Sequence, residues 1–293
     1  MDNASPPTII DMRLRPPFLH AFFGGVPDSP ERDVVRWVGR RVGAADPGNF
    51  ERYATWTDVR AGMDEAGIGL GVVVGRSTPT VRVSNDDVAA LVTLAGGRLV
   101  GVASVDPVAL GCERALAEAE RAVNGLGLVA LNLDAGFYET PLRACDDRLM
   151  PFYDLCMKLD VPAFVMSGPT TPDLAFNDPL AIDVVARVFP KLRIVVCHGC
   201  YPNVDAMVGV AFRNENVFVS PDMYFFAPGG RRYAEAASGF LQDQLLFGSS
   251  FPFRPMQQSV EDLRAFGLDA AVERKLLYEN AMKLIRIRAP GVH

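Results

Sequence analysis

Two arginines near the amino terminus form the most unusual pair of charged side chains in the sequence. Arg13 and Arg15 stand at the end of the apolar run TIIDMRL, residues 8–14. Residues two apart on a strand point to the same face of a sheet, so both guanidinium groups are expected to face the interior, and Asp11 with them. Charged groups buried in this way need anionic partners. The pair predicts either a bidentate clamp for a substrate carboxylate or another oxyanion, or a structural salt-bridge network, and we favour the clamp.

A histidine and an aspartate supply candidate acid–base chemistry. His198 is the one histidine in the middle of the chain, the others being His20 and His293. An imidazole titrates near neutral pH, so His198 is a candidate general acid or base, although it could also only hold a hydrogen bond. Asp222, in the string SPDMY, could activate a water or hold an arginine. An arginine partner would depress the pKa of Asp222 and make it a poor base.

Further polar side chains follow other apolar runs and are candidate substrate ligands: Arg76, Asn132, Asp134, Tyr201, Tyr224, Ser250 and Arg254. Cys197 and Cys200 form a single C-x-x-C string without a second pair, so a metal or redox role is not favoured, nor is Cys200 as a nucleophile. The string GSSFP lacks the second glycine of a nucleophile elbow, which makes a serine hydrolase a weak hypothesis.

The elements that would position these residues repeat along the chain. Apolar runs bounded by Gly, Pro or Asp occupy residues 8–14, 69–76, 99–106, 127–134, 162–168, 193–199, 217–223 and 245–251. Most are continuous rather than alternating, which is typical of parallel strands buried on both faces. Helical stretches are predicted over 56–66, 84–95, 111–124, 146–159, 178–188, 203–212, 234–241 and 269–286. This β-then-α repeat predicts an α/β fold, a (β/α)₈ TIM barrel with eight parallel strands and its active site at the carboxyl ends of those strands.

Domain organisation is predicted to be simple. No linker, low-complexity tract or internal repeat interrupts residues 1–293, so we expect a single barrel domain. Residues 16–55 form a long insertion after the first strand that contains several prolines and arginines. Loops of this length in compact domains usually serve as lids or interaction surfaces.

Composition excludes several classes of protein. The 293 residues are 49% hydrophobic and carry a formal charge of −6, which argues against disorder and against a basic nucleic-acid surface. No apolar run reaches the length that spans a bilayer, and the start of the chain lacks the pattern of a secretory signal. Five thinly spread cysteines fit reduced thiols in a cytoplasm. We expect a cytoplasmic protein without nucleic-acid or membrane partners, and the sequence leaves a homo-oligomer open.

Several strings together resemble the amidohydrolase superfamily, in particular the group that contains aminocarboxymuconate-semialdehyde decarboxylase and several lactone hydrolases. IIDMRLRPP is similar to that group's IIDxHxHxxP, and the run from CHGCYP to SPDMY is similar to its HxGxxxP segment. LLFGSSFPF is similar to LLFGSDYPF, and YENAMKLIRI to the terminal NAxxLF helix. The resemblance covers nearly the whole chain in order and implies the same barrel.

The departures from this pattern concern the metal site. Members of the group usually bind a divalent metal through two histidines after strand 1, one each after strands 5 and 6, and an aspartate after strand 8. Of these positions only His198 matches; the others are Arg13, Arg15, Met166 or its neighbour Ser167, and Ser250. A guanidinium is always protonated and offers only donors, so it cannot ligate a metal. We therefore expect neither a metal nor another cofactor.

The predicted function is a metal-independent hydrolase of a small carboxylated organic substrate. Arg13 and Arg15, with Arg76, would hold the anionic group and polarise the carbonyl, while His198 or Asp222 activates water. The reaction type, cleavage of a lactone or a related C–O or C–N bond, is what the resemblance implies. Two alternatives stay open: a non-hydrolytic lyase such as a decarboxylase or dehydratase acting on a similar acid, and a small-anion-binding protein without turnover.

Overall fold

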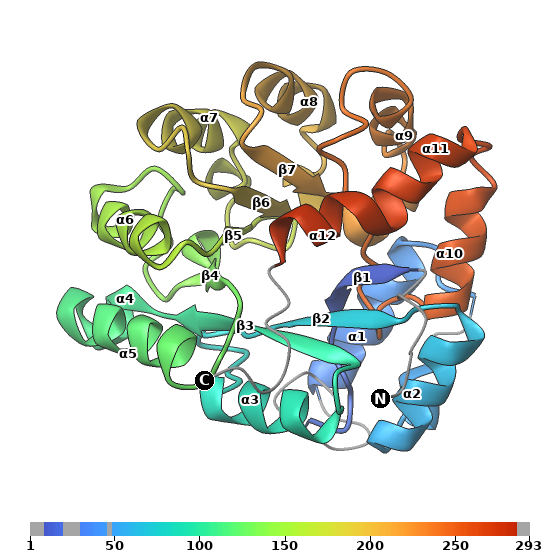
Figure 1. Ribbon diagram of the computed structural model, residues 1–293, viewed down its shortest axis with the longest axis horizontal. Coiled ribbons are helices and arrows are strands. Elements are labelled where there is room, and N and C mark those ends of the chain that lie inside the picture. The colour runs from blue at the N-terminus through green and yellow to red at the C-terminus, as the bar shows by residue number, and fades with distance from the viewer. Residues whose placement is uncertain (1–8, 20–29, 46–48, 286–293) are drawn as a thin grey trace, which may run out of the picture.

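A curled sheet of parallel strands forms the centre of the computed structural model, which describes residues 9–19, 30–45 and 49–285. Seven strands lie in chain order, each hydrogen-bonded in parallel to the next. They are β1 (Ile10–Leu14), β2 (Leu70–Val74), β3 (Leu99–Val105), β4 (Leu131–Leu133), β5 (Ala163–Met166), β6 (Ile194–Cys197) and β7 (Val217–Ser220). Helices surround the sheet on its outside (Figure 1). The predicted α/β barrel architecture is therefore present, with seven regular strands.

The predicted eighth strand is a closing segment, not a regular strand. Residues 245–251 are joined to the sheet by two isolated parallel bridges, Val219 with Leu245 and Leu14 with Phe251. The Asp11 carboxylate explains the interruption, because it accepts the backbone amides of Arg13 and Ser249, both at 2.9 Å. A side chain thus takes hydrogen bonds that a regular ladder would give to carbonyl groups. The prediction of eight regular strands was wrong at this seam.

Helices follow the strands along the chain, and the last three come after the closing segment. Their bounds are α2 (Trp56–Glu65), α3 (Asn85–Leu94), α4 (Pro107–Leu110), α5 (Cys112–Asn124), α6 (Met150–Leu159), α7 (Pro179–Val188), α8 (Val204–Arg213), α9 (Arg231–Ala237), α10 (Met256–Arg264), α11 (Ala270–Arg274) and α12 (Asn280–Leu284). Thr55 begins α2 with a capping box, and the Ser84 side chain caps α3. The short α4, all of α10 and α1 (Pro30–Arg41), which lies in the predicted insertion, were not predicted as helices. The helix expected over 269–286 is α11, a π-helical turn and α12, and residue 286 lies outside the described residues.

Apolar side chains fill the interior of the barrel at the end where the strands begin. Every second residue of β2, namely Leu70, Val72 and Val74, belongs to this buried cluster. Leu284 and Ile285 pack into the same cluster, and α12 crosses that end of the sheet in Figure 1. A separate, larger cluster fills the layer between the sheet and the helices. This cluster fills one end of the barrel interior, and polar residues occupy the opposite end.

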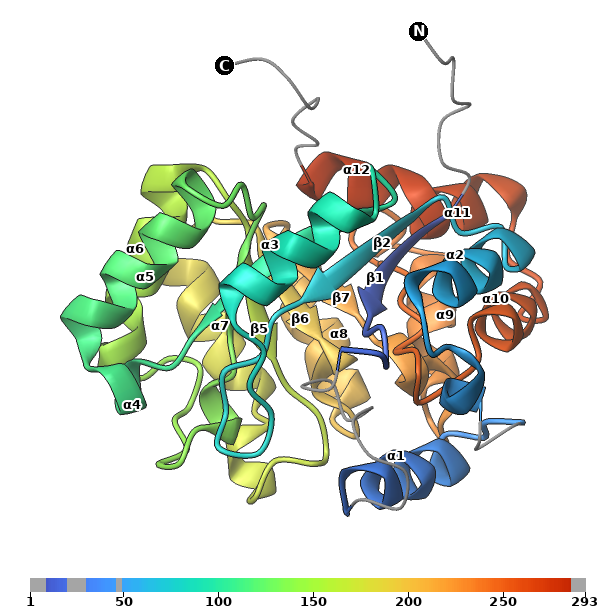
Figure 2. The ribbon, with the colours of Figure 1, turned by 90° about the horizontal axis from the view of Figure 1, so that it is seen from below.

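The insertion after β1 supplies a helix at that opposite end. Helix α1 (Pro30–Arg41) lies beyond the arrowheads of the strands in Figure 2. Val38 and Val42 pack against a cluster that includes Tyr224 and Phe253 from the strand-end loops. Part of the insertion, including His20, lies outside the described residues, as does His293.

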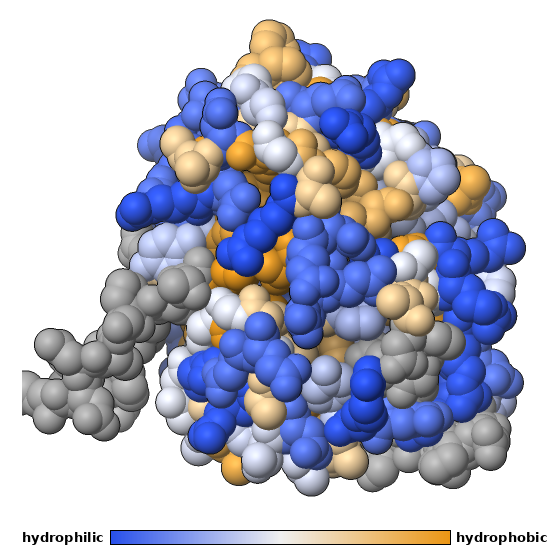
Figure 3. All heavy atoms as spheres, turned by 90° about the vertical axis from the view of Figure 1, so that its right-hand side faces the viewer, coloured by the Kyte–Doolittle hydropathy of each residue, from blue (hydrophilic) through white to orange (hydrophobic). Residues whose placement is uncertain are grey.

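The face of the molecule that Figure 3 shows is mostly hydrophilic. On the face of Figure 3, which carries α2, α10 and α11, hydrophilic side chains surround a smaller hydrophobic area near the middle. Within the described residues, no helix combines the length and the apolar character that crossing a membrane requires.

Candidate functional site

The polar residues of the site continue the same inward-facing rows that fill the apolar end. Arg76 follows Val72 and Val74 at the two-residue spacing of β2, and Asn132 and Asp134 follow the buried Ala130 in the same way. All three polar side chains are buried. The change from apolar to polar within one row places them where the strands end. Arg76 and Asp134 are in direct contact there, and Ser104 Oγ links Asn132 to Asp134.

Arg13 and Arg15 are fully buried, with 0% and 1% of their surface exposed. Among the described residues, the Arg13 guanidinium donates to two sulfur atoms, Cys197 Sγ at 3.5 Å and Met166 Sδ at 3.1 Å. Arg15 Nη1 reaches the carbonyl of Ser250 at 3.4 Å, and its guanidinium lies over the Phe253 ring at 5.1 Å. Across the described ranges, neither guanidinium has a carboxylate within ion-pair distance. The Nε atoms of both are buried and unbonded there.

Burial and like charge act together on this pair. The pKa of Arg15 is lowered well below its ordinary value by burial, and the neighbouring Arg13 and Arg76 guanidinium groups lower it further. Positive charges held close together in a dry environment are destabilising unless an anion joins them. Among the described residues, Arg13 and Arg15 are therefore not part of a structural salt-bridge network. Two neighbouring guanidinium groups offer planar donor sets of the kind that suits a bidentate anion.

Arg76 is different, because it has an internal counter-ion. Its Nε lies 2.7 Å from Asp134 Oδ1, and its guanidinium covers the Phe137 ring at 5.0 Å. Burial lowers the pKa of Arg76 and the Asp134 charge partly offsets that effect. The other oxygen of Asp134 accepts from the Ser77 amide at 3.1 Å and from Ser104 Oγ at 3.3 Å. Arg76 and Asp134 therefore form a structural ion pair.

Asn132 lies beside this ion pair with one polar atom free. Its Nδ2 donates to the Gly75 carbonyl at 3.1 Å and to Ser104 Oγ at 3.4 Å, which fixes the amide orientation. Its Oδ1 is buried and has no hydrogen-bond partner among the described residues, and the same holds for Ser250 Oγ. Buried polar atoms are normally paired. These two atoms therefore add an acceptor and a hydroxyl to the unpaired donors of Arg13 and Arg15.

His198 and Asp222 meet where β6 and β7 end. His198 Nδ1 lies 2.9 Å from Asp222 Oδ2 in a bent contact, and the His198 amide donates to the same oxygen at 3.1 Å. Burial lowers the pKa of His198 to about 4; Asp222 opposes this shift, while Arg13 and Arg15 add to it. Burial tends to raise the pKa of Asp222, but His198, Arg13 and Ser220 together hold it below its ordinary value. At neutral pH the pair is a neutral imidazole beside a carboxylate, as a general base requires.

The backbone around this pair is in an uncommon conformation. His198, Cys200, Asp222 and Ser250 all have positive φ, between 54° and 63°. Only one other described residue outside glycine shares this feature, Asp160, which ends α6. A Cβ added at Gly248 would collide with the Asp222 carboxylate and press on Arg13 Cβ. Left-handed backbone at non-glycine residues costs energy and gathers at functional sites.

Asp11 does not face the arginine side chains as expected. Its carboxylate lies between β1 and the closing segment, where Ser249 Oγ also donates to it at 2.5 Å. Burial raises the pKa of Asp11 to about 6, against the lowering effect of the donors from Ser249 and Arg13. The register of β1 shifts between Asp11 and Leu14, so strict alternation fails there. Sequence spacing alone carries no signal of this shift.

The remaining predicted ligands lie at the edge of the site. Tyr201 and Tyr224 stack face to face with ring centroids 4.7 Å apart, and the Tyr224 ring meets His198 edge-on at 5.4 Å. Arg254 is held away from this group: it donates to the Val42 carbonyl at 2.5 Å and pairs with Asp262. Its role as a substrate ligand stays a prediction.

The cysteines of the CHGC string are buried thiols. Burial raises the pKa of both Cys197 and Cys200 to about 12. Cys197 faces the Arg13 guanidinium, and the Cys200 amide donates to Ser167 Oγ. Neither is the thiolate that nucleophilic or metal chemistry needs.

The residues at this site do not fit a divalent metal. Two of the positions where the family resemblance places ligands carry guanidinium groups, and Met166 Sδ is already used by Arg13. His198 Nδ1 faces Asp222 Oδ2 at 2.9 Å. Among the described residues, no three His, Cys, Asp or Glu side chains come together as a set that could hold a metal ion. A cation would have to approach two positive charges, which oppose it.

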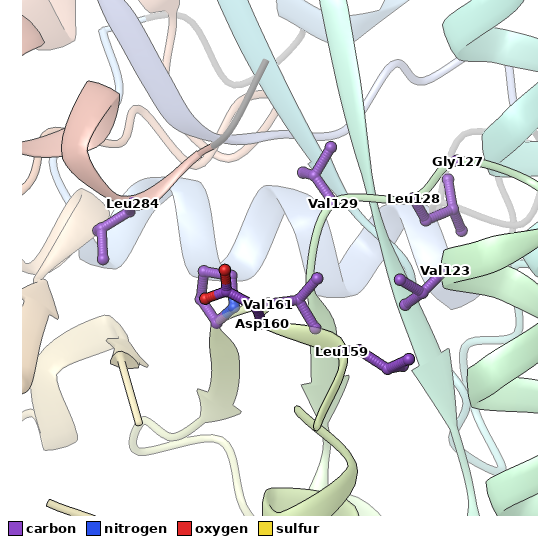
Figure 4. Close-up of a pocket in the computed structure, with 9 residues that line it drawn as sticks. Val123, Gly127, Leu128, Val129, Leu159, Asp160, Val161 and Leu284 are labelled. Carbon is purple, nitrogen blue, oxygen red and sulfur yellow. The ribbon is translucent and has the colours of Figure 1, made fainter. Parts of the chain in front are cut away.

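A small hollow at the other end of the barrel is not part of this site. It has a volume of about 120 Å³ and lies among loops that precede β4 and β5 (Figure 4). Mostly apolar side chains line it, including Leu128, Val161 and Leu284. Barrel enzymes use the carboxyl ends of the strands, so this hollow is not a catalytic candidate.

Comparison with known proteins identifies the family. Residues 10–287 match the family model described as Amidohydrolase. The chain belongs to the amidohydrolase family. A comparison with curated proteins gives no match.

Solved structures share the fold over nearly the whole chain. An uncharacterized TIM-barrel protein from Bordetella bronchiseptica is 34% identical, with a TM-score of 0.86, covering 94% of this amidohydrolase-family chain and 97% of that one. A dihydroxybenzoic acid decarboxylase from Polaromonas, solved with manganese and 2-nitroresorcinol, is 20% identical, with a TM-score of 0.66 and coverage of 96% and 98%. A 4-oxalomesaconate hydratase from Rhodopseudomonas palustris is 17% identical, with a TM-score of 0.61 and coverage of 94% and 95%. The last two likenesses show the fold alone.

Proposed function

We propose that this protein is a metal-independent enzyme that binds a small carboxylated substrate at the barrel mouth and hydrolyses a lactone or a related C–O or C–N bond. One observation carries the proposal. Two buried guanidinium groups, Arg13 and Arg15, lack a carboxylate partner in the described chain and lie beside an imidazole that is paired with a carboxylate. The family membership supports an enzyme, and the arginines support an anionic substrate.

The chemistry follows from the protonation states. In the tautomer whose Nδ1–H points to Asp222, Nε2 of His198 has a free lone pair and accepts a proton from water. The resulting hydroxide attacks the carbonyl carbon, and the charge that develops on the carbonyl oxygen is stabilised by an arginine donor. The imidazolium, balanced by Asp222, returns the proton to the departing oxygen or nitrogen. No atom beyond substrate and water is consumed.

Substrate binding itself would improve the base. Arg13 and Arg15 are among the groups that lower the pKa of His198. A carboxylate bound between them would neutralise their effect, so the pKa of His198 would rise toward neutral pH. The free enzyme would then hold a weak base, and the complex a stronger one.

A lyase is the second candidate. Decarboxylases and a hydratase stand among the structural neighbours, and both reactions use acids that the same arginines would bind. The bound manganese of the decarboxylase has no counterpart set of ligands among the described residues here. Binding without turnover is the third possibility and predicts ligand affinity with no product.

Isotope tracing separates these functions. Purified, chelator-treated protein would be incubated with a panel of carboxylated lactones and unsaturated dicarboxylates in H₂¹⁸O. Hydrolysis places ¹⁸O in a new carboxyl group, hydration places it in a hydroxyl group, and decarboxylation releases CO₂. Turnover that appears only after a divalent metal is restored would contradict metal independence. Thermal shifts without any product would favour the binding protein.

A further inference from the structure

A second hollow adjoins the candidate site, between α1 and the strand-end loops. Its volume is about 390 Å³, which is in the range of small-molecule pockets. Helix α1 and its end supply one side, and the loops after β5, β6 and β7 supply the other. The lining residues are Trp37, Val38, Arg41, Val42, Pro169, Thr170, Tyr201, Tyr224, Ala227 and Pro228.

Aromatic rings and one cation dominate these walls. The stacked rings of Tyr201 and Tyr224 are nearly parallel, with an interplanar angle of 6°. Trp37 is 44% exposed although it is a large apolar side chain, and the Arg41 guanidinium lies over its ring at 4.8 Å. Flat π-systems stack well on such rings, and an arginine favours an electron-rich or anionic ligand.

The hollow and the candidate site share their walls. Tyr224 lines the hollow while its ring edge touches His198. Val38 and Val42 line it too, and they pack in one cluster with Phe253, the ring that lies under Arg15. A molecule held by the arginines would therefore meet this aromatic wall as it extends outward.

We infer that the hollow is an outer subsite that takes a flat, aromatic or conjugated part of the substrate. Trp37 and Arg41 would select such molecules over saturated ones, with the carboxylate held by Arg13 and Arg15. The inference rests on the proposed function for its carboxylate arm only. Helix α1 was not predicted, but the spacing of Val35, Val38 and Val42 is a signal that could have indicated it, because these apolar side chains lie on one face and pack toward the barrel.

Matched probes test the subsite without turnover. Calorimetric titration of the full chain would compare trans-cinnamate, 3-cyclohexylpropanoate and cinnamyl alcohol, which vary ring flatness and charge separately. We expect cinnamate to bind roughly five- to tenfold more tightly than the saturated acid. Trp37→Ala would remove that preference, and Trp37→Phe would retain most of it. In a Trp56→Phe background, cinnamate binding would also change the fluorescence of Trp37, then the sole indole.

A neighbouring arginine provides the control. Arg41→Ala is expected to weaken cinnamate binding about threefold, whereas Arg40→Ala, in the same last turn but outside the hollow, would not. Equal affinity for the flat and saturated acids, unchanged by Trp37→Ala, would overturn the subsite, and so would the absence of binding by all three probes. Equal, Trp37-dependent binding of cinnamate and cinnamyl alcohol would support the subsite but contradict the arginine clamp.

Discussion

His198 Nδ1 and the His198 backbone amide both contact one oxygen of Asp222, at 2.9 and 3.1 Å. The second Asp222 oxygen accepts a hydrogen bond from Ser220 Oγ at 2.5 Å. One carboxylate therefore fixes the turn after β6 and orients the imidazole at the same time. The loop conformation and the chemistry of the base depend on the same side chain.

Asp222→Asn should lower kcat by about 100-fold or more, because the imidazolium formed in the reaction loses its counter-charge. The asparagine oxygen can still accept the His198 amide, so the turn should persist. Steady-state kinetics on a substrate found by isotope tracing would measure the effect, with circular dichroism as the check on folding. A kcat within about threefold of the parent would show that Asp222 only shapes the loop.

The pKa of His198 should rise when a carboxylate binds. In the free protein it is about 4, so the folded state binds fewer protons here than the unfolded chain. This group therefore contributes stability above its unfolded pKa, and that contribution is lost as pH falls through 4. With only three histidines in the chain, NMR titration can follow His198 with and without cinnamate. An unchanged pKa in the saturated complex would contradict the clamp.

The two kinds of arginine should respond oppositely to removal of charge. Arg15→Met removes a buried charge without an ion-pair partner in the described chain, so stability should stay equal or rise, while carboxylate binding is lost. Arg76→Met leaves the buried Asp134 carboxylate uncompensated and should cost about 3–5 kcal/mol of unfolding free energy. Urea unfolding of both variants gives the comparison. A strong loss of stability in Arg15→Met would show that Arg15 stabilises the fold through its contacts with the Ser250 carbonyl and the Phe253 ring, and would contradict its interpretation as an uncompensated charge.

Gly248→Ala should destabilise the protein by about 1–3 kcal/mol, because the new methyl group meets the Asp222 carboxylate. Gly209→Ala is the matched control: it lies in α8 with open space around its Cβ and should add about 0.5–1 kcal/mol. Thermal unfolding measures both. An unaffected Gly248→Ala variant would show that the packing around Asp222 can relax.

The sequence predicted much of this arrangement, and its failures are local. Continuous apolar runs identified the first seven strands, since strands buried on both faces are apolar throughout. The closing segment could not be separated from them, because the Asp11–Ser249 contact joins residues 238 positions apart. Helix α10 was missed because its sequence MQQSVEDLR is largely polar.

Within the site, the sequence placed Arg76, Asn132 and Asp134 directly after apolar runs, and all three are buried in the structure. The sequence could not show that Arg76 has an internal carboxylate partner, whereas Arg13 and Arg15 have no carboxylate within ion-pair distance among the described residues. That distinction depends on which strands become neighbours. Trp37 and Arg41 were overlooked because the packing of an insertion is decided by distant contacts.

The contact between β1 and the closing segment also determines at which stage of folding the candidate site can form. Met12 donates to the Phe247 carbonyl and Arg15 to the Phe251 carbonyl, at 2.9 and 3.0 Å. The edge of β1 that does not pair with β2 is therefore hydrogen-bonded only when residues more than two hundred positions later have folded against it. Closing so long a loop is slow. Arg13 lies on that strand and Arg15 directly follows it. A chain that has folded its middle strands but not its ends has not yet formed the candidate site, so ligand binding there would report complete assembly of the barrel.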